Sequence, residues 1–211
     1  GSVDEGAENV AERLRSALAI PLADQLAWPN EYRAWNTWRE AAENLGVLVF
    51  QFGSVPLEEV RGVALLRQPM PVVGINTKEI PEARVYTLVH ELVHLMLANA
   101  KEEVAALNEH STAKEWQIVE RFAEEATSLT LVPVNALQEV IAQLRLASGS
   151  WTIENIRKLA RRFRITPLAM ATRLATGGYM SWQQYHAWRK TWDAYVEQLP
   201  ARIEGPVAQS L

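Results

Sequence analysis

Two of the four histidines in the chain lie four residues apart, in the stretch His90-Glu91-Leu92-Val93-His94. On a helix, residues at positions i and i+4 project from the same face, so both imidazoles can bind one metal ion. Glu91 then lies beside the first ligand, where its carboxylate can take a proton from a bound water molecule. Because zinc lowers the pKa of such a water toward neutrality, this pattern predicts hydrolysis at a zinc site.

A catalytic zinc site needs a third protein ligand and keeps one position open. Cysteine is absent from the chain, so the third ligand has to be a histidine or a carboxylate. Glu120, on a second predicted helix, is the first candidate. Glu124 and Glu125 fit the spacing equally well, and His110 could serve if the intervening segment folds back. The helical period alone leaves all four open, and a chance occurrence of the five-residue motif in an apolar helix is the competing interpretation.

The residues around the motif predict the elements that position it. Residues 81–100 form a helix that begins near Pro81, with an apolar face packed into the core (Val89, Leu92, Val93 and Leu95). Three β-branched stretches before it, at 47–52, 60–66 and 71–76, predict a small sheet paired as antiparallel hairpins. Residues 101–115 predict a loop or short helix, and residues 115–133 a second long helix ending at Pro133.

Two stretches of the sequence resemble the ImmA/IrrE-type family of bacterial zinc metallopeptidases: GINTKEIPEARVYTLVHELVHLMLAN and, later in the chain, VERFAEEATSLTLVPVNAL. In that family a strand ending in asparagine and an arginine precede the motif helix, and here Asn76 and Arg84 match this pair. Alignment on Pro133 implies that Glu120 is the third ligand. The resemblance, which covers about residues 35–137, implies an α+β fold with a zincin-like metallopeptidase domain, built from a small sheet, the motif helix and the third-ligand helix.

The chain departs from the family pattern at three positions: Val93 replaces a glycine, Asn99 a frequent histidine, and Glu124 an asparagine. None of these changes removes a ligand or the base. The resemblance therefore implies a regulatory endopeptidase with one Zn²⁺ per chain. Its substrate would be a helix-turn-helix repressor whose cleavage releases genes for DNA-damage or other stress responses, mobile elements or phage defence. Single-stranded DNA is a candidate activator.

Other residues near the motif are candidates for supporting roles. Hydrolysis builds negative charge on the carbonyl oxygen, and Tyr86, Arg84 and His110 are candidates to stabilise it, or to support the ligands from behind. Asn76 and the strand before it are candidates to pair with an extended substrate, because proteases commonly bind a peptide as an added strand.

The last third of the chain predicts a helical module. A Ser-Gly-Ser break at 148–150 suggests domain boundaries at 1–30 (N-terminal helical extension), 31–148 (zincin-like domain) and 149–211 (helical module). Residues 151–180 predict a helix-turn-helix, with Thr166 as a cap and Pro167 in the first turn. Its basic residues are either nucleic-acid contacts or a solvated helix face: Arg157, Lys158, Arg161, Arg162 and Arg164. The tryptophan-rich last helix is either a stacking platform for single strands or ordinary packing.

The composition of the chain limits which partners, cellular location and metal we expect. The formal net charge of −4 gives the chain no general affinity for polyanions, and no apolar run is long enough for a membrane span, so we expect a cytoplasmic protein with no membrane partner. Two histidines and a carboxylate favour zinc, although manganese could substitute. The alternative functions are a DNA-binding sensor with a non-catalytic or structural metal site, and an antitoxin-like or scaffolding partner.

Overall fold

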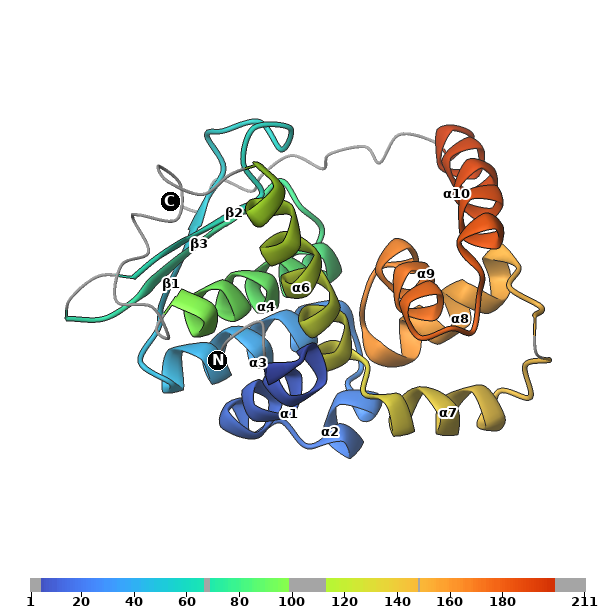
Figure 1. The fold of residues 1–211 in the computed structure, drawn as a ribbon, viewed down its shortest axis with the longest axis horizontal. Coiled ribbons are helices and arrows are strands. Elements are labelled where there is room, and N and C mark those ends of the chain that lie inside the picture. The colour runs from blue at the N-terminus through green and yellow to red at the C-terminus, as the bar shows by residue number, and fades with distance from the viewer. Residues whose placement is uncertain (1–4, 67–68, 99–112, 148, 200–211) are drawn as a thin grey trace, which may run out of the picture.

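The computed structural model describes residues 5–66, 69–98, 113–147 and 149–199 (Figure 1). Three helices come first: α1 (Ala7–Leu18), α2 (Leu22–Ala27) and α3 (Glu31–Asn44). The sheet follows, with β1 (Leu48–Phe52), β2 (Gly62–Leu65) and β3 (Val72–Asn76). The remaining elements are helices: α4 (Pro81–Ala98), α6 (Ala113–Leu131), α7 (Val134–Gln143), α8 (Ile153–Phe163), α9 (Pro167–Thr176) and α10 (Trp182–Glu197). This is the α+β class that the sequence predicts.

The sheet has the strand order β1-β3-β2, so β3 is its central strand. β1 pairs with β3 in parallel and β2 pairs with β3 antiparallel. The predicted series of antiparallel hairpins is therefore wrong for β1. The reason lies in burial: β3 is the most buried strand, with Val73 and Ile75 fully buried, and the central position is the one that covers it from both sides. β2 is left as an edge strand.

Helix α4 carries the motif and packs beneath the sheet. It begins at Pro81, as predicted, because proline suits the first helical position, where no backbone N–H is needed. The four predicted core residues are all buried: Val89, Leu92, Val93 and Leu95. Their burial fixes the rotation of the helix, and α4 contacts β2, β3, α3 and α6. In Figure 1, α4 lies between the sheet and α3, and α6 crosses it.

The hydrophobic core runs without interruption through the three predicted segments of the chain. Buried side chains of α1, α3, the sheet, α4, α6, α8 and α9 belong to one cluster. A fully buried amide reinforces the junction: Gln25 donates to the carbonyl oxygens of Leu131 and Phe163, at 3.0 and 3.2 Å, and accepts from Arg15 at 2.8 Å. The boundaries at 30 and 148 stay predictions, and the core is continuous across both.

The helical module has the predicted helix-turn-helix order. Thr166 caps α9 by accepting from the backbone N–H of Ala169 at 3.1 Å, and Pro167 occupies the first turn, which confirms the predicted cap. Most of α9 is buried or half-buried, and it packs against α6, α8 and α10. In α10 only Trp188 is buried, whereas Trp182 is 52% exposed. Among the described residues, no helix has the length and apolar character needed to cross a bilayer.

Candidate metal centre

The structure brings the two motif histidines and one carboxylate together. His90 and His94 project from one face of α4, and their Nε2 atoms lie 3.1 Å apart. Glu120 reaches the same point from α6, with its two carboxylate oxygens 3.4 Å from His90 Nε2 and 3.1 Å from His94 Nε2. Among the described residues, these three side chains are the one group of three or more histidine or carboxylate side chains close enough together to bind a single metal ion. One ligand atom of each lies within 4.8 Å of the other two. Glu124 and Glu125 are not members of this group.

The separations between these side chains fit a tetrahedral zinc ion. With bonds of about 2.0–2.1 Å, neighbouring ligand atoms of a tetrahedron lie about 3.4 Å apart. The two Nε2 atoms are 3.1 Å apart, and each lies 3.1 or 3.4 Å from the nearer carboxylate oxygen of Glu120. Hydrogen bonds with His90 and His94 lower the pKa of Glu120 to about 2, so this carboxylate is in the ionised form that a cation requires. The side chains of His90 and His94 are 18% and 19% exposed, and that of Glu120 is 33% exposed, so small molecules can reach the site.

Glu91 lies beside the ligands and under the edge strand. Burial raises its pKa, and the nearby His90 and His94 partly oppose that rise. The backbone of β2 passes directly over the carboxylate: a Cβ at Gly62 would stand 2.9 Å from Glu91 Oε1. A half-buried carboxylate with a raised pKa, next to a metal site, is suited to accept and return a proton.

Two aromatic rings hold the imidazoles in place. Tyr86 stacks on His90 with ring centroids 6.3 Å apart, and Trp116 stacks on His94 at 6.0 Å with an interplanar angle of 8°. Burial raises the pKa of the Tyr86 hydroxyl, with smaller contributions from Glu124 and other neighbours, so this group stays a hydrogen-bond donor. The sequence analysis missed Trp116; its position one turn before Glu120 on the same helix was the signal that could have found it.

Arg84 is held by the turn between β3 and α4. Its Nε donates to the carbonyl oxygen of Glu79 at 2.8 Å, and its Nη2 donates to that of Thr77 at 2.5 Å. These bonds give the residue a structural task in the turn that leads into the motif helix. Its suggested part in oxyanion stabilisation stays a prediction, and His110, the third candidate, lies outside the described residues.

The prediction that Asn76 and its strand pair with substrate is wrong, because β3 has neighbours on both edges. The Asn76 side chain is fully buried and donates to the carbonyl oxygens of Val55 and Val60, at 2.9 and 2.8 Å. It therefore anchors the segment that precedes β2. Among the described residues, the strand next to Glu91 that is paired on one edge only is β2.

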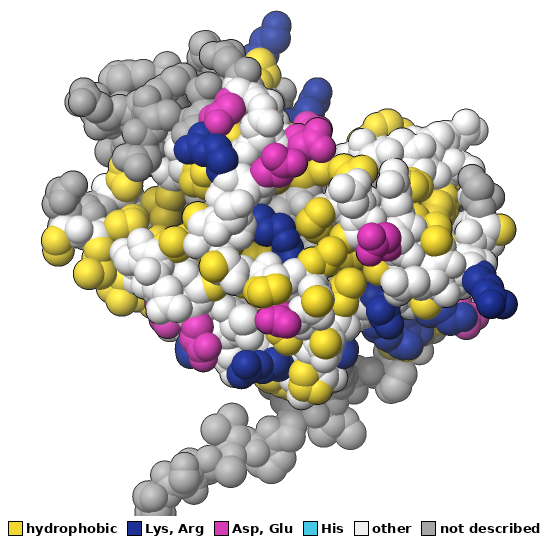
Figure 2. Space-filling model, turned by 90° about the horizontal axis from the view of Figure 1, so that it is seen from below, with side chains coloured by type: hydrophobic (Ala, Val, Ile, Leu, Met, Phe, Trp, Pro, Cys, Tyr) yellow, Lys and Arg dark blue, Asp and Glu magenta, His cyan; other side chains and the backbone are white. Residues whose placement is uncertain are grey.

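The five predicted nucleic-acid contacts lie on and after α8, and several have partners within the protein. Arg157 donates to the Tyr195 hydroxyl at 2.7 Å, Lys158 pairs with Glu154 at 2.8 Å, and Arg164 donates to the carbonyl oxygen of Trp28. Arg161 and Arg162 are exposed, and Arg162 lies 3.4 Å from a Gln143 oxygen. On the face shown in Figure 2, several basic side chains lie close together at the lower right, and elsewhere basic side chains are interspersed with acidic and hydrophobic ones.

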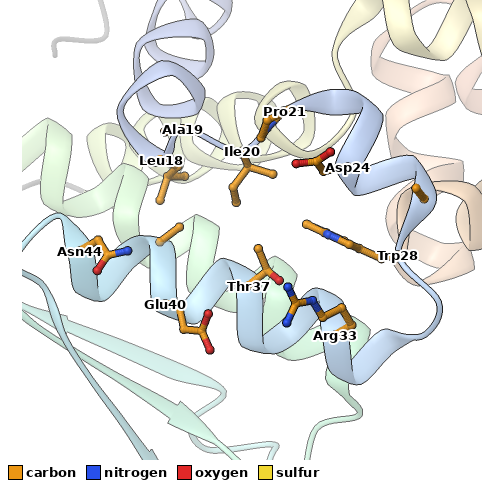
Figure 3. A pocket seen from close by; sticks show the side chains of 12 residues that line it. Leu18, Ala19, Ile20, Pro21, Asp24, Trp28, Arg33, Thr37, Glu40 and Asn44 are labelled. Atoms are coloured by element: carbon orange, nitrogen blue, oxygen red, sulfur yellow. The ribbon is translucent and has the colours of Figure 1, made fainter.

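A surface cavity of about 510 Å³ lies away from the metal centre, between the α1–α2 connection and α3. Figure 3 shows the residues that line the cavity. They include Ile20, Trp28 and Thr37 together with three charged residues, Asp24, Arg33 and Glu40. None of the candidate site residues borders it, so the cavity is not part of the proposed centre.

A histidine pair on one helix, a carboxylate on a second helix and a half-buried glutamate beside the first histidine define a candidate metallopeptidase centre on a mixed α+β fold. The comparison with known families agrees. Residues 42–175, more than half of the chain, match the family described as the IrrE N-terminal-like domain, which is a peptidase family. The chain belongs to this family.

Solved structures share the fold. One of them is a Mycobacterium tuberculosis transcriptional regulator, which is 14% identical and superposes with a TM-score of 0.56. The match covers 80% of this chain and 46% of that chain, so the present chain spans about half the length of this relative. At this identity the likeness concerns the fold alone. No protein of curated function matches the chain in sequence.

Proposed function

We propose that the chain is a zinc-dependent regulatory endopeptidase that cleaves a helix-turn-helix transcriptional repressor and so derepresses stress, mobile-element or phage-defence genes. The observation that carries the proposal is the convergence of His90, His94 and Glu120 with the half-buried Glu91 beside them. A purely structural metal site needs no base next to its ligands. Membership of a peptidase family supports the reaction class, and the repressor substrate follows from the family resemblance. Such a substrate places the reaction in the cytoplasm.

Each side chain has a definite task in this reaction. His90, His94 and Glu120 would hold the zinc ion, which supplies Lewis acidity and acidifies a bound water. Glu91 would accept the proton of the attacking water on its carboxylate and deliver it to the departing amide nitrogen. Tyr86 keeps its hydroxyl proton and lies against His90, so it is the best placed of the suggested donors for the carbonyl oxygen.

The edge strand β2 is the proposed binding site for the substrate backbone. In the part of the chain that the structure describes, one edge of β2 has no partner strand, and such an edge can accept an extended peptide as an additional strand held through main-chain hydrogen bonds. Gly62 lies directly over Glu91, so a peptide paired along β2 would run past the base. A repressor cleaved in this way has to present its scissile bond in an extended segment.

The test is incubation of the zinc-loaded protein with the repressor encoded beside its gene, with and without single-stranded DNA. We expect one discrete cleavage, its loss on chelation with EDTA, and a fall of about 10²–10⁴-fold in rate for Glu91→Gln. The Glu91→Gln variant should still bind zinc, because Glu91 is not a ligand. Repressor loss that persists in cells carrying Glu91→Gln would refute the peptidase proposal, and binding that survives EDTA without cleavage would favour the scaffolding alternative.

The DNA-sensor alternative meets an obstacle in the helical module. In a DNA-reading helix-turn-helix the second helix enters the major groove, and here that helix, α9, is largely covered by α6, α8 and α10. The contacts suggested for the basic residues of α8 stay a prediction. Salt-dependent binding of duplex or single-stranded DNA, weakened by Arg161→Ala with Arg162→Ala, would support them.

A further inference from the structure

A buried carboxylate that the proposed mechanism does not use lies beneath the start of β2. The Glu79 side chain is 2% exposed. One of its oxygens accepts from Thr87 Oγ1 at 2.7 Å, and the other lies 3.3 Å from Arg61 Nη1. Thr87 is on α4, one turn before Glu91, and Arg61 directly precedes β2. A single carboxylate therefore ties the edge strand to the motif helix.

The gap between these two elements is narrow and is where the base lies. A Cβ at Gly62 would overlap the methyl carbon of Thr87 and stand 2.9 Å from Glu91 Oε1 and 3.2 Å from Glu91 Cγ. Real Cβ atoms do not approach other atoms this closely. The absence of a side chain at Gly62 is therefore what allows the Thr87 and Glu91 side chains to lie side by side under β2.

The hydrogen bond to Glu79 also fixes how Thr87 is turned. Thr87 has one methyl group and one hydroxyl group on Cβ, and few staggered orientations are available to it on a helix. With the hydroxyl bound to Glu79, it is the methyl that faces Gly62. Without Glu79, the hydroxyl would be free to turn and donate to the Glu91 carboxylate, one turn further along the helix.

The backbone that carries Glu79 is itself anchored. Arg84 donates to the carbonyl oxygen of Glu79, and the buried Asn76 side chain ties the same turn to the segment before β2. Burying a carboxylate is costly, and an apolar side chain would serve stability alone better. Its two hydrogen-bonded partners, one on each side of the gap, point instead to a positioning task.

We propose that Glu79 and Gly62 are positioning residues for the base: Glu79 holds Thr87 and the start of β2 at a fixed separation, and Gly62 leaves the space in which the Glu91 carboxylate lies. This inference rests on the proposed function, since it assigns the two residues to the role of Glu91. Neither residue contacts the reacting atoms.

The first test compares Glu79→Ala with Glu79→Gln, which keeps an acceptor for Thr87. For repressor cleavage we expect Glu79→Ala to lower kcat at least ten-fold while KM and the Kd for Zn²⁺, measured by calorimetry, stay within three-fold of the wild-type values. Glu79→Gln should restore most of kcat. Glu59→Ala, which removes an exposed carboxylate from the segment before β2, is the control and should change nothing. Thr87→Val should behave like Glu79→Ala, and the double variant should be no worse than either one.

The second test is Gly62→Ala, for which we expect the same fall in kcat at unchanged zinc affinity. Gly53→Ala is the matched control, because its added methyl group would meet Thr77 Oγ1 and not Glu91. If Glu79→Ala does not fold, then Glu79→Gln, Thr87→Val and Gly62→Ala carry the test. Unchanged kcat in Thr87→Val and Gly62→Ala, or a loss matched by an equal loss of zinc affinity, overturns the proposal.

A probe that does not depend on cleavage separates this inference from the proposed function. If the wild-type protein does not cleave the repressor, the proposed substrate is wrong, and the affinity of zinc-loaded protein for acetohydroxamate, calibrated with Glu91→Gln, reports where the Glu91 carboxylate lies. Binding at least ten-fold weaker in Glu79→Ala and Gly62→Ala, but not in Glu59→Ala or Gly53→Ala, supports the positioning role. Equal binding in all variants overturns it.

Discussion

Replacing Glu120 tests the third ligand, which spacing in the sequence leaves open. Zinc at 100 times its Kd stabilises a protein by about 2.7 kcal/mol. For a chain of this size each kcal/mol raises Tm by roughly 2–4 °C, so wild-type protein should gain roughly 5–10 °C. A four-ligand zinc site contributes about 10–16 kcal/mol, or roughly 3 kcal/mol per ligand, so loss of one ligand should weaken binding about 100-fold.

The same zinc concentration should therefore be close to the Kd of the Glu120→Ala variant. Zinc should then raise the free energy of unfolding of this variant by only about 0.4 kcal/mol and its Tm by roughly 1 °C. Without zinc the substitution should have a small effect, under about 1 kcal/mol, because the Glu120 side chain is one-third exposed. The assay is thermal unfolding with and without zinc. Glu124→Ala and Glu125→Ala are the controls, since neither belongs to the group of ligand atoms. A full zinc-dependent rise in Glu120→Ala, or its loss in Glu124→Ala, would refute the assignment.

Three further predictions concern stability and spectroscopy. Burial raises the pKa of Glu79, so the contribution of Glu79 to stability is largest below the ordinary carboxyl pKa and is lost as pH rises through the raised pKa. In urea unfolding, the free energy of unfolding of Glu79→Gln should therefore increase relative to that of the wild type between pH 4 and 8. A difference that does not change with pH would contradict this. Gln25→Leu leaves two buried carbonyl oxygens without their donor and removes one of the acceptors of Arg15, so it should cost roughly 2–4 kcal/mol in one cooperative urea transition. The exposed-residue control Gln183→Leu should not show this loss. Because Trp116 stacks on His94, zinc binding should alter the tryptophan fluorescence of the protein. Trp116→Phe should remove most of that change. An equal change in the variant would mean that a different tryptophan responds to zinc.

Local patterns in the sequence predicted the motif helix well. The start at Pro81, the buried face of α4 and the Thr166 cap of α9 all depend on interactions within one or two helical turns, and the structure has each of them. In α3, Tyr32 and Leu45 lie on the same helical stripe as the buried Trp38, but they are 61% and 43% exposed. A helical period predicts which residues share a face and not how far along the helix its neighbours reach.

The edge strand shows where pattern recognition in the sequence ends. All three strands were predicted, but their order was not, because strand order depends on which strand gains most from having two neighbours. The error moved the proposed substrate strand from β2 to β3. The same limit hid Gly62 and Glu79, since no spacing rule links either residue to Glu91.

By itself, the sequence determined that His90 and His94 face the same way with Glu91 between them, because the pitch of an α-helix sets the direction of residues four apart whatever surrounds it. Spacing in the sequence left Glu120, Glu124 and Glu125 open and only the family resemblance implied Glu120, whereas the tertiary structure shows Glu120 meeting these histidines, because the rotation of α6 is set by its packing on α4 and α1. The position of β2 over Glu91 was decided in the same way. Contacts between elements distant in sequence arise from burial of apolar surface shared by the whole core, and no local spacing encodes them.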